Sequence, residues 1–454
     1  MIVEASEIQE QVARITERLN VPGVSVGVYH DGRETYASHG VTSLDNPLPV
    51  ERDTLFQIGS TTKTFTATAI MRLVERGRID LDAPVRTYVP ELRLRDEGVA
   101  GRVTVLQLLN HTAGWDGDFF HDTGDGDDAL AHYVDAMVRL DQVSPPGRAV
   151  SYNNAAFCLA GRVIERVTDR TYEAALAELV LGPLGLERCF LFPADVMTRR
   201  FAVGHVEREG GLQVARPWRL PRSSTPAGAI VSDAADQIRY ARFHLGDGTS
   251  DGERVLERAT LERMKRPTAD ATGSSLGDEI GIAWLLKRAG GARLAGHGGT
   301  TNGQQSGFQL VPEHDFAFTI LTNSDSGHRL ERELTAWLLD TYLGIVPEKP
   351  ETLTLPAEEL ERYAGRYESD TSVVSVRVDG TLLVATVTYS EEARAKVRAI
   401  MGEVPEEPPM PLAILPDDGF LIMGGRSEGA RGAFVREHGA VAGINFGGRI
   451  ARRA

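Results

Sequence analysis

Hydrophobic residues in the first 345 positions follow the helical period in some segments and alternate in others, which predicts an α+β fold. Ile8, Val12 and Ile15 recur at helical spacing, so residues 4–19 are predicted as an amphipathic helix. Residues 24–30 alternate apolar and small side chains, and the turn Asp31-Gly32 leads to a second predicted strand at 34–39. Further helices are predicted at 61–76, 105–110, 129–140, 155–168, 172–179, 234–245 and 329–342, and further strands at 293–296, 304–311 and 316–322. We therefore expect an antiparallel sheet that is built from both ends of this region and flanked by helices.

The pattern changes after residue 345. Residues 346–356 contain three prolines among polar and charged residues, which is typical of an interdomain linker. Short alternating runs follow at 373–378, 382–389, 420–423 and 432–436, separated by Gly and Asp turns. The sequence thus predicts a domain at 1–345, a linker at 346–356 and an all-β barrel domain at 357–454.

Composition narrows the classes of function. The 454 residues carry a formal net charge of −15, which argues against nucleic acid or an anionic membrane as the main partner. No apolar stretch approaches the roughly 20 residues that span a bilayer, and the N-terminus lacks the basic and apolar regions of a secretory signal. We expect a soluble, cytoplasmic protein, with a homo-oligomer left open. Cys158 and Cys189 have no Cys-x-x-Cys neighbour and are expected to pack as small apolar groups.

The strongest candidate for chemistry is Ser60-Thr61-Thr62-Lys63, at the start of the predicted helix 61–76. Residues three apart share a helix face, so the Ser60 hydroxyl and the Lys63 amine can meet. A serine becomes nucleophilic when a neighbouring base takes its proton, and a lysine with a lowered pKa can be that base. The unpaired N–H groups of a helix N-terminus also suit an oxyanion. The alternative is that Ser60 only caps the helix.

Two later segments add candidates. Tyr152 and Asn154 lie at a loop-to-helix junction, from which side chains can project into a cleft; alternatively the tyrosine packs and Asn154 caps the helix. His297-Gly298-Gly299-Thr300 precedes the strand predicted at 304–311, and its glycines allow a substrate backbone to approach closely. The alternative for His297 is a turn histidine.

Together these segments resemble the serine β-lactamase and penicillin-binding-protein superfamily, whose motifs are Ser-x-x-Lys, Tyr-x-Asn and a Lys-Thr-Gly-like triplet in that order. Here the triplet is His297-Gly298-Gly299, as in the family VIII esterase and D-aminopeptidase branches. Residues 108–114, 226–228 and 281–284 support the likeness, which covers residues 5–343. The resemblance implies a β-lactamase/transpeptidase-like domain, and residues 357–454 resemble the lipocalin-like barrel appended to some members.

The resemblance also implies roles. Ser60 would be the acylated nucleophile, Lys63 its proton partner, and Tyr152 the proton relay to the leaving group. Asn154 would hydrogen-bond Lys63 or a substrate amide. His297 would replace the lysine that supports the tyrosine and the substrate carboxylate, and a neutral imidazole attracts an anion less than an ammonium does. Gly298, Gly299 and Thr300 would bind substrate, with the N–H groups of Ser60 and Thr300 as the oxyanion hole. No cofactor or metal is implied.

Other motifs have simpler interpretations. The pentapeptides 248–252 and 273–277 match Gly-x-Ser-x-Gly, but neither has the strand before and helix after that a nucleophile elbow needs, so both are interpreted as turns. The run 116–128 holds six aspartates without the spacing of a calcium loop and is interpreted as a solvated loop near the cleft. His111 is expected to satisfy local backbone groups.

The sequence therefore predicts a serine hydrolase that works through an acyl-enzyme on Ser60. Small carboxylic esters and peptides with D-residues are its candidate substrates. The alternatives are acyl transfer to an amine, as in the penicillin-binding-protein-like thioesterases that cyclise peptides, and a catalytically silent ligand-binding module.

Overall fold

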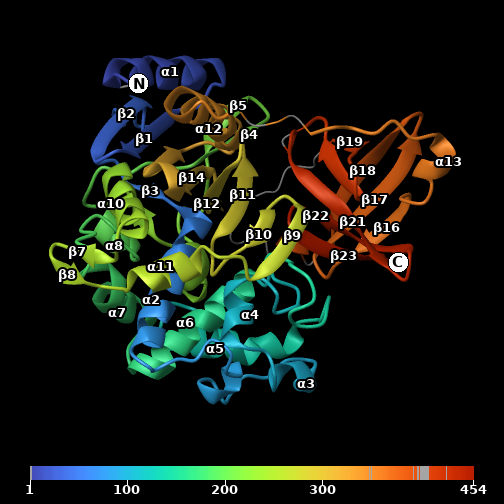
Figure 1. Cartoon of the computed structure of the whole chain (residues 1–454), viewed down its shortest axis with the longest axis horizontal. Coiled ribbons are helices and arrows are strands. Elements are labelled where there is room, and N and C mark those ends of the chain that lie inside the picture. The colour runs from blue at the N-terminus through green and yellow to red at the C-terminus, as the bar shows by residue number, and fades with distance from the viewer. Residues whose placement is uncertain are drawn as a thin grey trace.

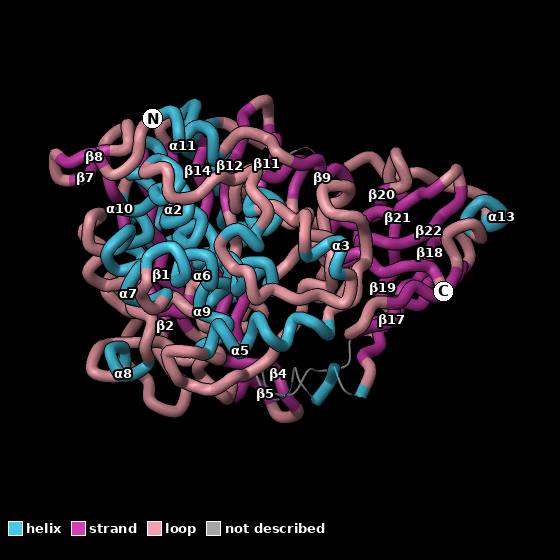
Figure 2. Tube along the Cα trace, turned by 90° about the horizontal axis from the view of Figure 1, so that it is seen from below, coloured by secondary structure: helices cyan, strands magenta, loops and turns pink. Residues whose placement is uncertain are grey.

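The computed structural model describes residues 3–346, 348, 350–391, 393–395, 398, 408–425 and 427–454. A unit of sheet and helices occupies the left of Figure 1, and a barrel formed by the C-terminal strands stands beside it. The helices gather in the first unit, whereas the second consists mainly of strands (Figure 2). Within the described residues, no helix has the length and apolarity needed to cross a bilayer.

The first unit is organised around a nine-stranded antiparallel sheet. Its strand order is β2-β1-β15-β14-β12-β11-β10-β9, with β13 paired to β14. Its strands are β1 (Gly23–His30), β2 (Arg33–Gly40), β9 (Ala269–Ser274), β10 (Gly277–Ile280), β11 (Leu285–Ala289), β12 (Ala292–Gly296), β13 (Gly299–Thr301), β14 (Gln304–Val311) and β15 (Phe316–Thr322). Strand β1 pairs with β15, with Val26 opposite Ile320. The predicted sheet from both ends of the region is therefore confirmed, although β9, β10, β11 and β13 were not predicted.

Both faces of the sheet are covered because its central strands alternate two sets of apolar side chains. On β15, Phe316, Phe318 and Ile320 belong to the cluster shared with α1 (Ala5–Arg18) and α12 (Gly327–Leu343). The intervening Ala317 and Leu321 belong to the larger core on the other face, to which α10 (Ala234–Leu245) contributes. This period-two alternation buries the strand on both sides.

The remaining elements form the helical region and its edges, except α13, which packs on the barrel (Figure 1). They are α2 (Thr62–Glu75), α3 (Glu97–Ala100), α4 (Val105–Leu109), α5 (Ala129–Ala136), α6 (Asn154–Thr168), α7 (Tyr172–Leu176), α8 (Pro193–Val196), α9 (Thr225–Gly228), α11 (Arg258–Met264) and α13 (Ala357–Leu360), with the short strands β3 (Phe56–Gln57), β4 (His205–Arg208), β5 (Gly211–Val214), β6 (Val231–Ser232), β7 (Thr249–Ser250) and β8 (Glu253–Arg254). Two predicted helices are shorter than expected. The helix predicted at 129–140 continues past α5 as a 3₁₀ turn, and that at 172–179 continues past α7 as a π-turn over Ala177–Leu181. Cys158 and Cys189 are free and buried, as predicted.

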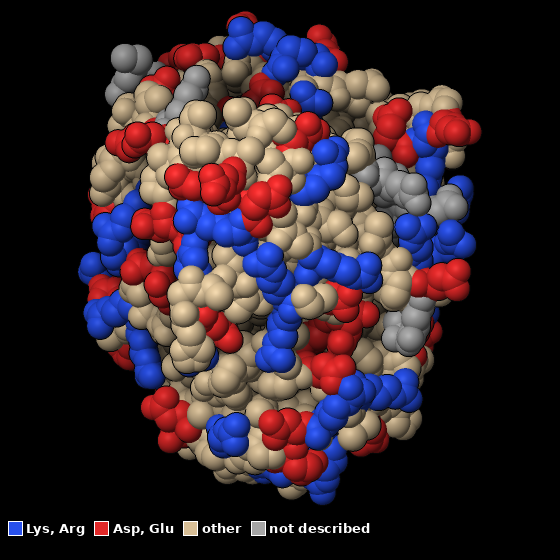
Figure 3. All heavy atoms as spheres, turned by 90° about the vertical axis from the view of Figure 1, so that its right-hand side faces the viewer, with Lys and Arg blue, Asp and Glu red and all other residues tan. Residues whose placement is uncertain are grey.

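The C-terminal strands close into the predicted barrel. Its strands are β16 (Gly365–Glu368), β17 (Ser372–Asp379), β18 (Leu382–Tyr389), β19 (Met410–Ile414), β20 (Gly419–Ile422), β21 (Arg431–Glu437), β22 (Ala440–Phe446) and β23 (Arg449–Arg453). Strand β16 pairs with β23 and closes the ring, and the aromatic rings of Tyr367, Phe420 and Phe434 help to fill it. Of the predicted linker, Pro347 and Lys349 lie outside the described residues. Acidic and basic side chains are mixed across the side of the molecule on which the barrel lies (Figure 3).

One turn of the barrel docks on the first unit. The Tyr152 N–H donates to Gly448 O at 2.8 Å, and the Ile450 N–H donates to Ser151 Oγ at 3.2 Å. These bonds fix the β22–β23 turn against the segment that carries the Tyr-x-Asn motif, with Arg449 between them.

Candidate active site

Ser60 and Lys63 form a contact pair at the start of α2. Ser60 lies in a 3₁₀ turn over Gly59–Thr61, and the Lys63 Nζ is 3.0 Å from its Oγ. The Ser60 side chain does not cap the helix, because the residue at the N-cap of α2 is Thr61 and no side-chain cap bond forms. The geometry therefore favours the nucleophile interpretation over the capping one.

Lys63 is fully buried, with 0% of its surface exposed. Besides Ser60, its Nζ contacts Asn154 Oδ1 at 2.8 Å and Ala227 O at 2.6 Å. Burial lowers the pKa of Lys63 to about 7, and the charge of Arg449 also lowers it, against the opposite effects of Cys158 and Asp118. A lysine in this environment can be neutral near pH 7 and accept a proton.

Tyr152 lies over this pair. It is 6% exposed, and burial raises its pKa, while its hydrogen bond with Ser60 offsets part of that rise. The centroids of the Tyr152 and His111 rings are 4.4 Å apart, and the Arg449 guanidinium lies 4.8 Å from the Tyr152 ring centroid. The phenol is therefore held neutral beside Ser60, in a form that can donate a proton.

His297 is buried and neutral. Burial, together with the charge of Lys63, lowers the pKa of His297 to about 3. Its Nδ1 lies 2.6 Å from Gly298 O, so this nitrogen carries the proton, and its buried Nε2 has no hydrogen-bond partner among the described residues. His297 lines the same cavity as Ser60, which places it in the cleft rather than in a plain turn.

The glycines after His297 have a packing role that sequence reasoning missed. A Cβ on Gly299 would lie 1.9 Å from Ile58 O, and one on Gly59 would lie 2.7 Å from the Thr300 N. Strand β13 therefore runs in direct backbone contact with the Ser60 turn. At Gly299 the absent side chain allows this contact between two backbone segments, and not only an approach by substrate.

Asn154 is held at both ends of its amide. The helix cap is its neighbour Asn153, whose side chain accepts from the Ala156 N–H at 2.8 Å, which corrects the alternative that Asn154 caps α6. The Asn154 Oδ1 faces Lys63, and its Nδ2 donates to Asp118 Oδ1 at 2.9 Å. Of its two predicted partners, Asn154 thus contacts the lysine.

Asp118 and Arg449 are site residues that sequence reasoning missed. The Arg449 Nε donates to Asp118 Oδ2 at 2.8 Å, and its Nη2 donates to Asp118 Oδ1 at 3.1 Å. Burial raises the pKa of Asp118. The charge and hydrogen bonds of Arg449 and the hydrogen bond from Asn154 lower this pKa by more than burial raises it, so the net shift is downward. The expectation of a solvated loop at 116–128 is thus wrong for Asp118, whose side chain is only 20% exposed.

One cavity of about 720 Å³ gathers the predicted residues. Ser60, Tyr152, Asn154 and the segment from His297 to Thr300 line it, and Lys63 lies behind Ser60. Arg449 and Tyr389 of the barrel also line it. His111 is outside the lining and accepts from the Asn153 N–H at 3.0 Å, as expected of a residue that satisfies the backbone.

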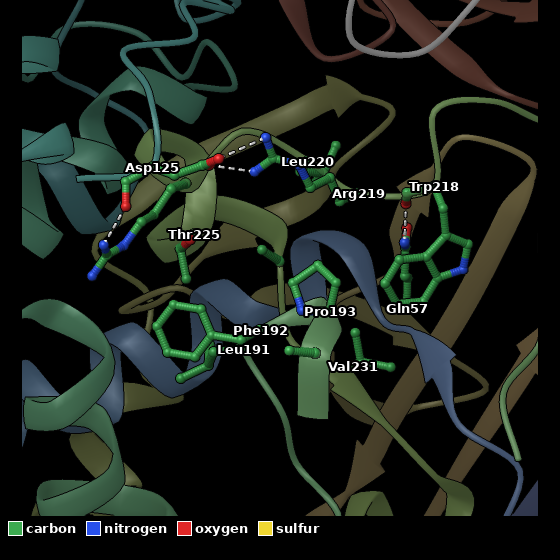
Figure 4. A pocket seen from close by; sticks show the side chains of 13 residues that line it. Gln57, Asp125, Leu191, Phe192, Pro193, Trp218, Arg219, Leu220, Thr225 and Val231 are labelled. Atoms are coloured by element: carbon green, nitrogen blue, oxygen red, sulfur yellow. Dashed lines mark hydrogen bonds and ion pairs between the residues drawn. The ribbon is translucent and has the colours of Figure 1, made fainter. Parts of the chain in front are cut away.

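Two further cavities adjoin this one. The first, of about 400 Å³, has apolar walls from Leu191, Phe192 and Val231 (Figure 4). Leu220 lines both it and the cavity of Ser60, so the two meet there. The second, of about 470 Å³, lies between the barrel and the first unit and shares Thr300 with the cavity of Ser60. An elongated ligand on Ser60 thus has room in two directions.

Both pentapeptides that match Gly-x-Ser-x-Gly include turns, as predicted. Residues 248–252 include the turn between β7 and β8, and 273–277 include the turn between β9 and β10. Neither serine therefore stands between a strand and a helix.

Comparison with known proteins agrees with this site. The Beta-lactamase family model matches residues 8–343. Penicillin-binding protein 4 of Amycolatopsis lactamdurans is 34% identical over 371 residues, which are 80% of this chain and 97% of that protein. SurE has a TM-score of 0.77 and 28% identity over 99% of both chains. D-amino acid amidase from Ochrobactrum anthropi SV3 has a TM-score of 0.60 and 26% identity, over 70% of this chain and 90% of that one.

These neighbours support an activity of the serine hydrolase type. The chain belongs to the beta-lactamase family, over a span that includes every motif from Ser60 to Thr300. The predicted family resemblance is confirmed over residues 8–343.

Proposed function

We propose that the protein is a serine hydrolase that forms an acyl-enzyme on Ser60 with an ester or amide donor. The contacts of Lys63 carry this proposal. A neutral amine has two N–H groups and one lone pair, and two of its three partners, Ala227 O and Asn154 Oδ1, are carbonyl oxygens that only accept. Both N–H groups are thereby used, and the lone pair is left for the third partner, the Ser60 hydroxyl.

The reaction then follows from these positions. Lys63 takes the Ser60 proton as Oγ attacks the donor carbonyl, and the N–H groups of Ser60 and Thr300 receive the oxyanion. Tyr152, neutral and bonded to Ser60, donates the proton that the leaving group needs. His297 lines the same cavity, and its ring centroid lies 6.0 Å from that of Tyr152. A water molecule then attacks the ester on Ser60 and gives its proton to Tyr152, while Lys63 returns its proton to Ser60 Oγ as the acid is released.

The proposed donors are acyl groups whose carbonyl belongs to a D-amino acid residue. Two relatives support this choice: the D-amino acid amidase has been solved with D-phenylalanine, and SurE with D-Leu. The cavity that meets the Ser60 cavity at Leu220 offers apolar room for the part of a longer donor that precedes this residue. Peptide donors are therefore proposed alongside single residues.

Matched enantiomers test this specificity. Initial rates are measured with D- and L-Leu and D- and L-Phe p-nitroanilides and p-nitrophenyl esters, with Ser60→Ala as the background. We expect kcat/KM at least tenfold higher for the D forms and no turnover by the variant. Equal rates for both enantiomers would contradict the D-specificity, and turnover that survives in Ser60→Ala would contradict the mechanism.

Acyl transfer to an amine is the second candidate. The cavity between the barrel and the first unit favours it, because this cavity shares Thr300 with the Ser60 cavity and has room for an acceptor. Adding an amino acid amide as acceptor distinguishes the two outcomes, since transfer yields a new amide and hydrolysis yields only the acid. A silent binding module is the remaining alternative, and it predicts that Ser60→Ala retains the full biological effect.

A further inference from the structure

Asp118, Asn154 and Lys63 form a continuous chain of contacts that starts at the barrel. Arg449, the first residue of β23, makes two bonds to the Asp118 carboxylate through its guanidinium. That carboxylate accepts from Asn154 Nδ2, and Asn154 Oδ1 lies against Lys63. Backbone bonds at Gly448 and Ile450 hold the β22–β23 turn on both sides of Arg449.

The polarity of this chain is set at its barrel end. A guanidinium only donates hydrogen bonds and an ionised carboxylate only accepts them. Asp118 must therefore face the NH₂ group of Asn154, which turns the amide oxygen toward Lys63. If the amide were reversed, its NH₂ would face Nζ, and the lysine lone pair would be drawn to Asn154 instead of Ser60.

We propose that Asp118, held by Arg449 of the barrel, is a positioning residue that fixes the amide orientation of Asn154 and so directs the Lys63 lone pair at Ser60. Asp118 touches neither Ser60 nor Lys63 through a hydrogen bond of the structure and acts through Asn154. The barrel thus takes part in the active site by orienting the base. This inference rests on the proposed function, which makes Lys63 the base.

Asp118→Asn is the first test, because it keeps the shape and removes the charge. An amide at position 118 has one accepting oxygen where the carboxylate has two, so it cannot accept from both Arg449 donors and from Asn154 at once, and the orientation of the Asn154 amide is no longer enforced. We expect Ser60 acylation by a p-nitrophenyl ester at pH 8 to fall at least tenfold. Asp122→Asn, at an exposed aspartate of the same loop, is the matched control and should keep the wild-type rate.

The exchange Asp118→Asn with Asn154→Asp is the decisive variant. The carboxylate now at position 154 accepts from the NH₂ group at position 118 on one side and from Lys63 on the other, so the lone pair is again directed at Ser60. An opposite charge beside an amine raises its pKa, by about 1–3 units. We therefore expect acylation at pH 9.5 to recover at least tenfold over Asp118→Asn, with its half-maximal pH above that of the wild type.

The titration of Lys63 gives a readout that does not depend on activity. The chain has five lysines, so lysine labelled with ¹³C at Cε gives few signals, and Lys63→Arg assigns the one of interest. The groups that face Lys63 and bear on its charge are Asp118, Arg449, Cys158, Tyr152, His111 and His297. The exchange changes only the position of the negative charge among them, and we expect the pKa of Lys63 to rise.

The outcomes separate the two proposals. If the wild type acylates Ser60 and Asp118→Asn keeps its rate, or if the exchange variant recovers none of the loss at pH 9.5 while its thermal unfolding matches that of Asp118→Asn, the positioning role of Asp118 is refuted. If the wild type itself forms no acyl-enzyme, the proposed function fails. In that case a Lys63 pKa that is unchanged in the exchange variant also refutes the contact chain.

Discussion

Replacing the proposed base tests the role of Lys63 most sharply. The ordinary pKa of lysine is 10.5, and burial lowers that of Lys63 to about 7. At pH 8 roughly nine-tenths of Lys63 is then neutral, against about 0.3% of an ordinary lysine, a difference of roughly 300-fold in active base. Because a base must be neutral, acylation should rise with pH, be half-maximal near pH 7 and level off above pH 8.

The assay is the burst of p-nitrophenol on mixing enzyme with an activated ester, from pH 5.5 to 9.5. Lys63→Arg keeps the positive charge but has no titratable base at these pH values. We expect the acylation rate of this variant to fall by about 10²–10⁴-fold, the usual contribution of a general base. Its acylation rate should also no longer depend on pH near 7.

Lys265→Arg is the matched control. Burial also lowers the pKa of Lys265 to about 7, but its Nζ bonds to His244 O and Leu261 O, away from Ser60. This variant should keep the wild-type profile. An acylation rate that stays constant from pH 6 to 9, or a limb near pH 7 that survives in Lys63→Arg, would refute the assignment of the base.

Other positions give separate expectations. Tyr152→Phe should slow anilide cleavage more than ester cleavage, because p-nitrophenolate leaves without a proton and an anilide does not; the ratio of the two kcat values measures this. Gly299→Ala should lower thermal stability by about 1–3 kcal/mol, since its Cβ would lie 1.9 Å from Ile58 O, whereas Gly298→Ala, with its nearest neighbour at 3.2 Å, should cost less in the same melting experiment. Ala194→Trp narrows the cavity that meets the Ser60 cavity at Leu220 and should raise KM for tripeptide donors while single-residue donors keep theirs; equal effects on both would contradict the proposed path of the donor.

Residues that act through local geometry could be predicted from the sequence. Ser60 and Lys63 share a helix face because three residues separate them, and the structure places Nζ 3.0 Å from Oγ. The long amphipathic helices and the alternating strands were predicted for the same reason, since a period of 3.6 or 2 is visible in a single segment.

Residues that act through contacts between distant parts of the chain could not be predicted from the sequence. Asp118 and Arg449 lie 331 positions apart and meet only because the barrel docks on the first unit, and neither stands in a motif that predicts a partner. Strands β9 and β10 were not predicted for a related reason. They are short and polar, and their pairing with neighbours, rather than their own pattern, makes them strands.

The central claim is that Ser60 carries the acyl group. Intact mass after brief acid quench, followed by peptide mapping, measures this directly with a D-Phe ester, its L enantiomer and a penicillin. The account predicts an adduct on the peptide that contains Ser60, most abundant with the D ester, slower to form at pH 6 than at pH 8, and absent from Ser60→Ala. No adduct with any donor at either pH, or an adduct on another residue, would contradict it.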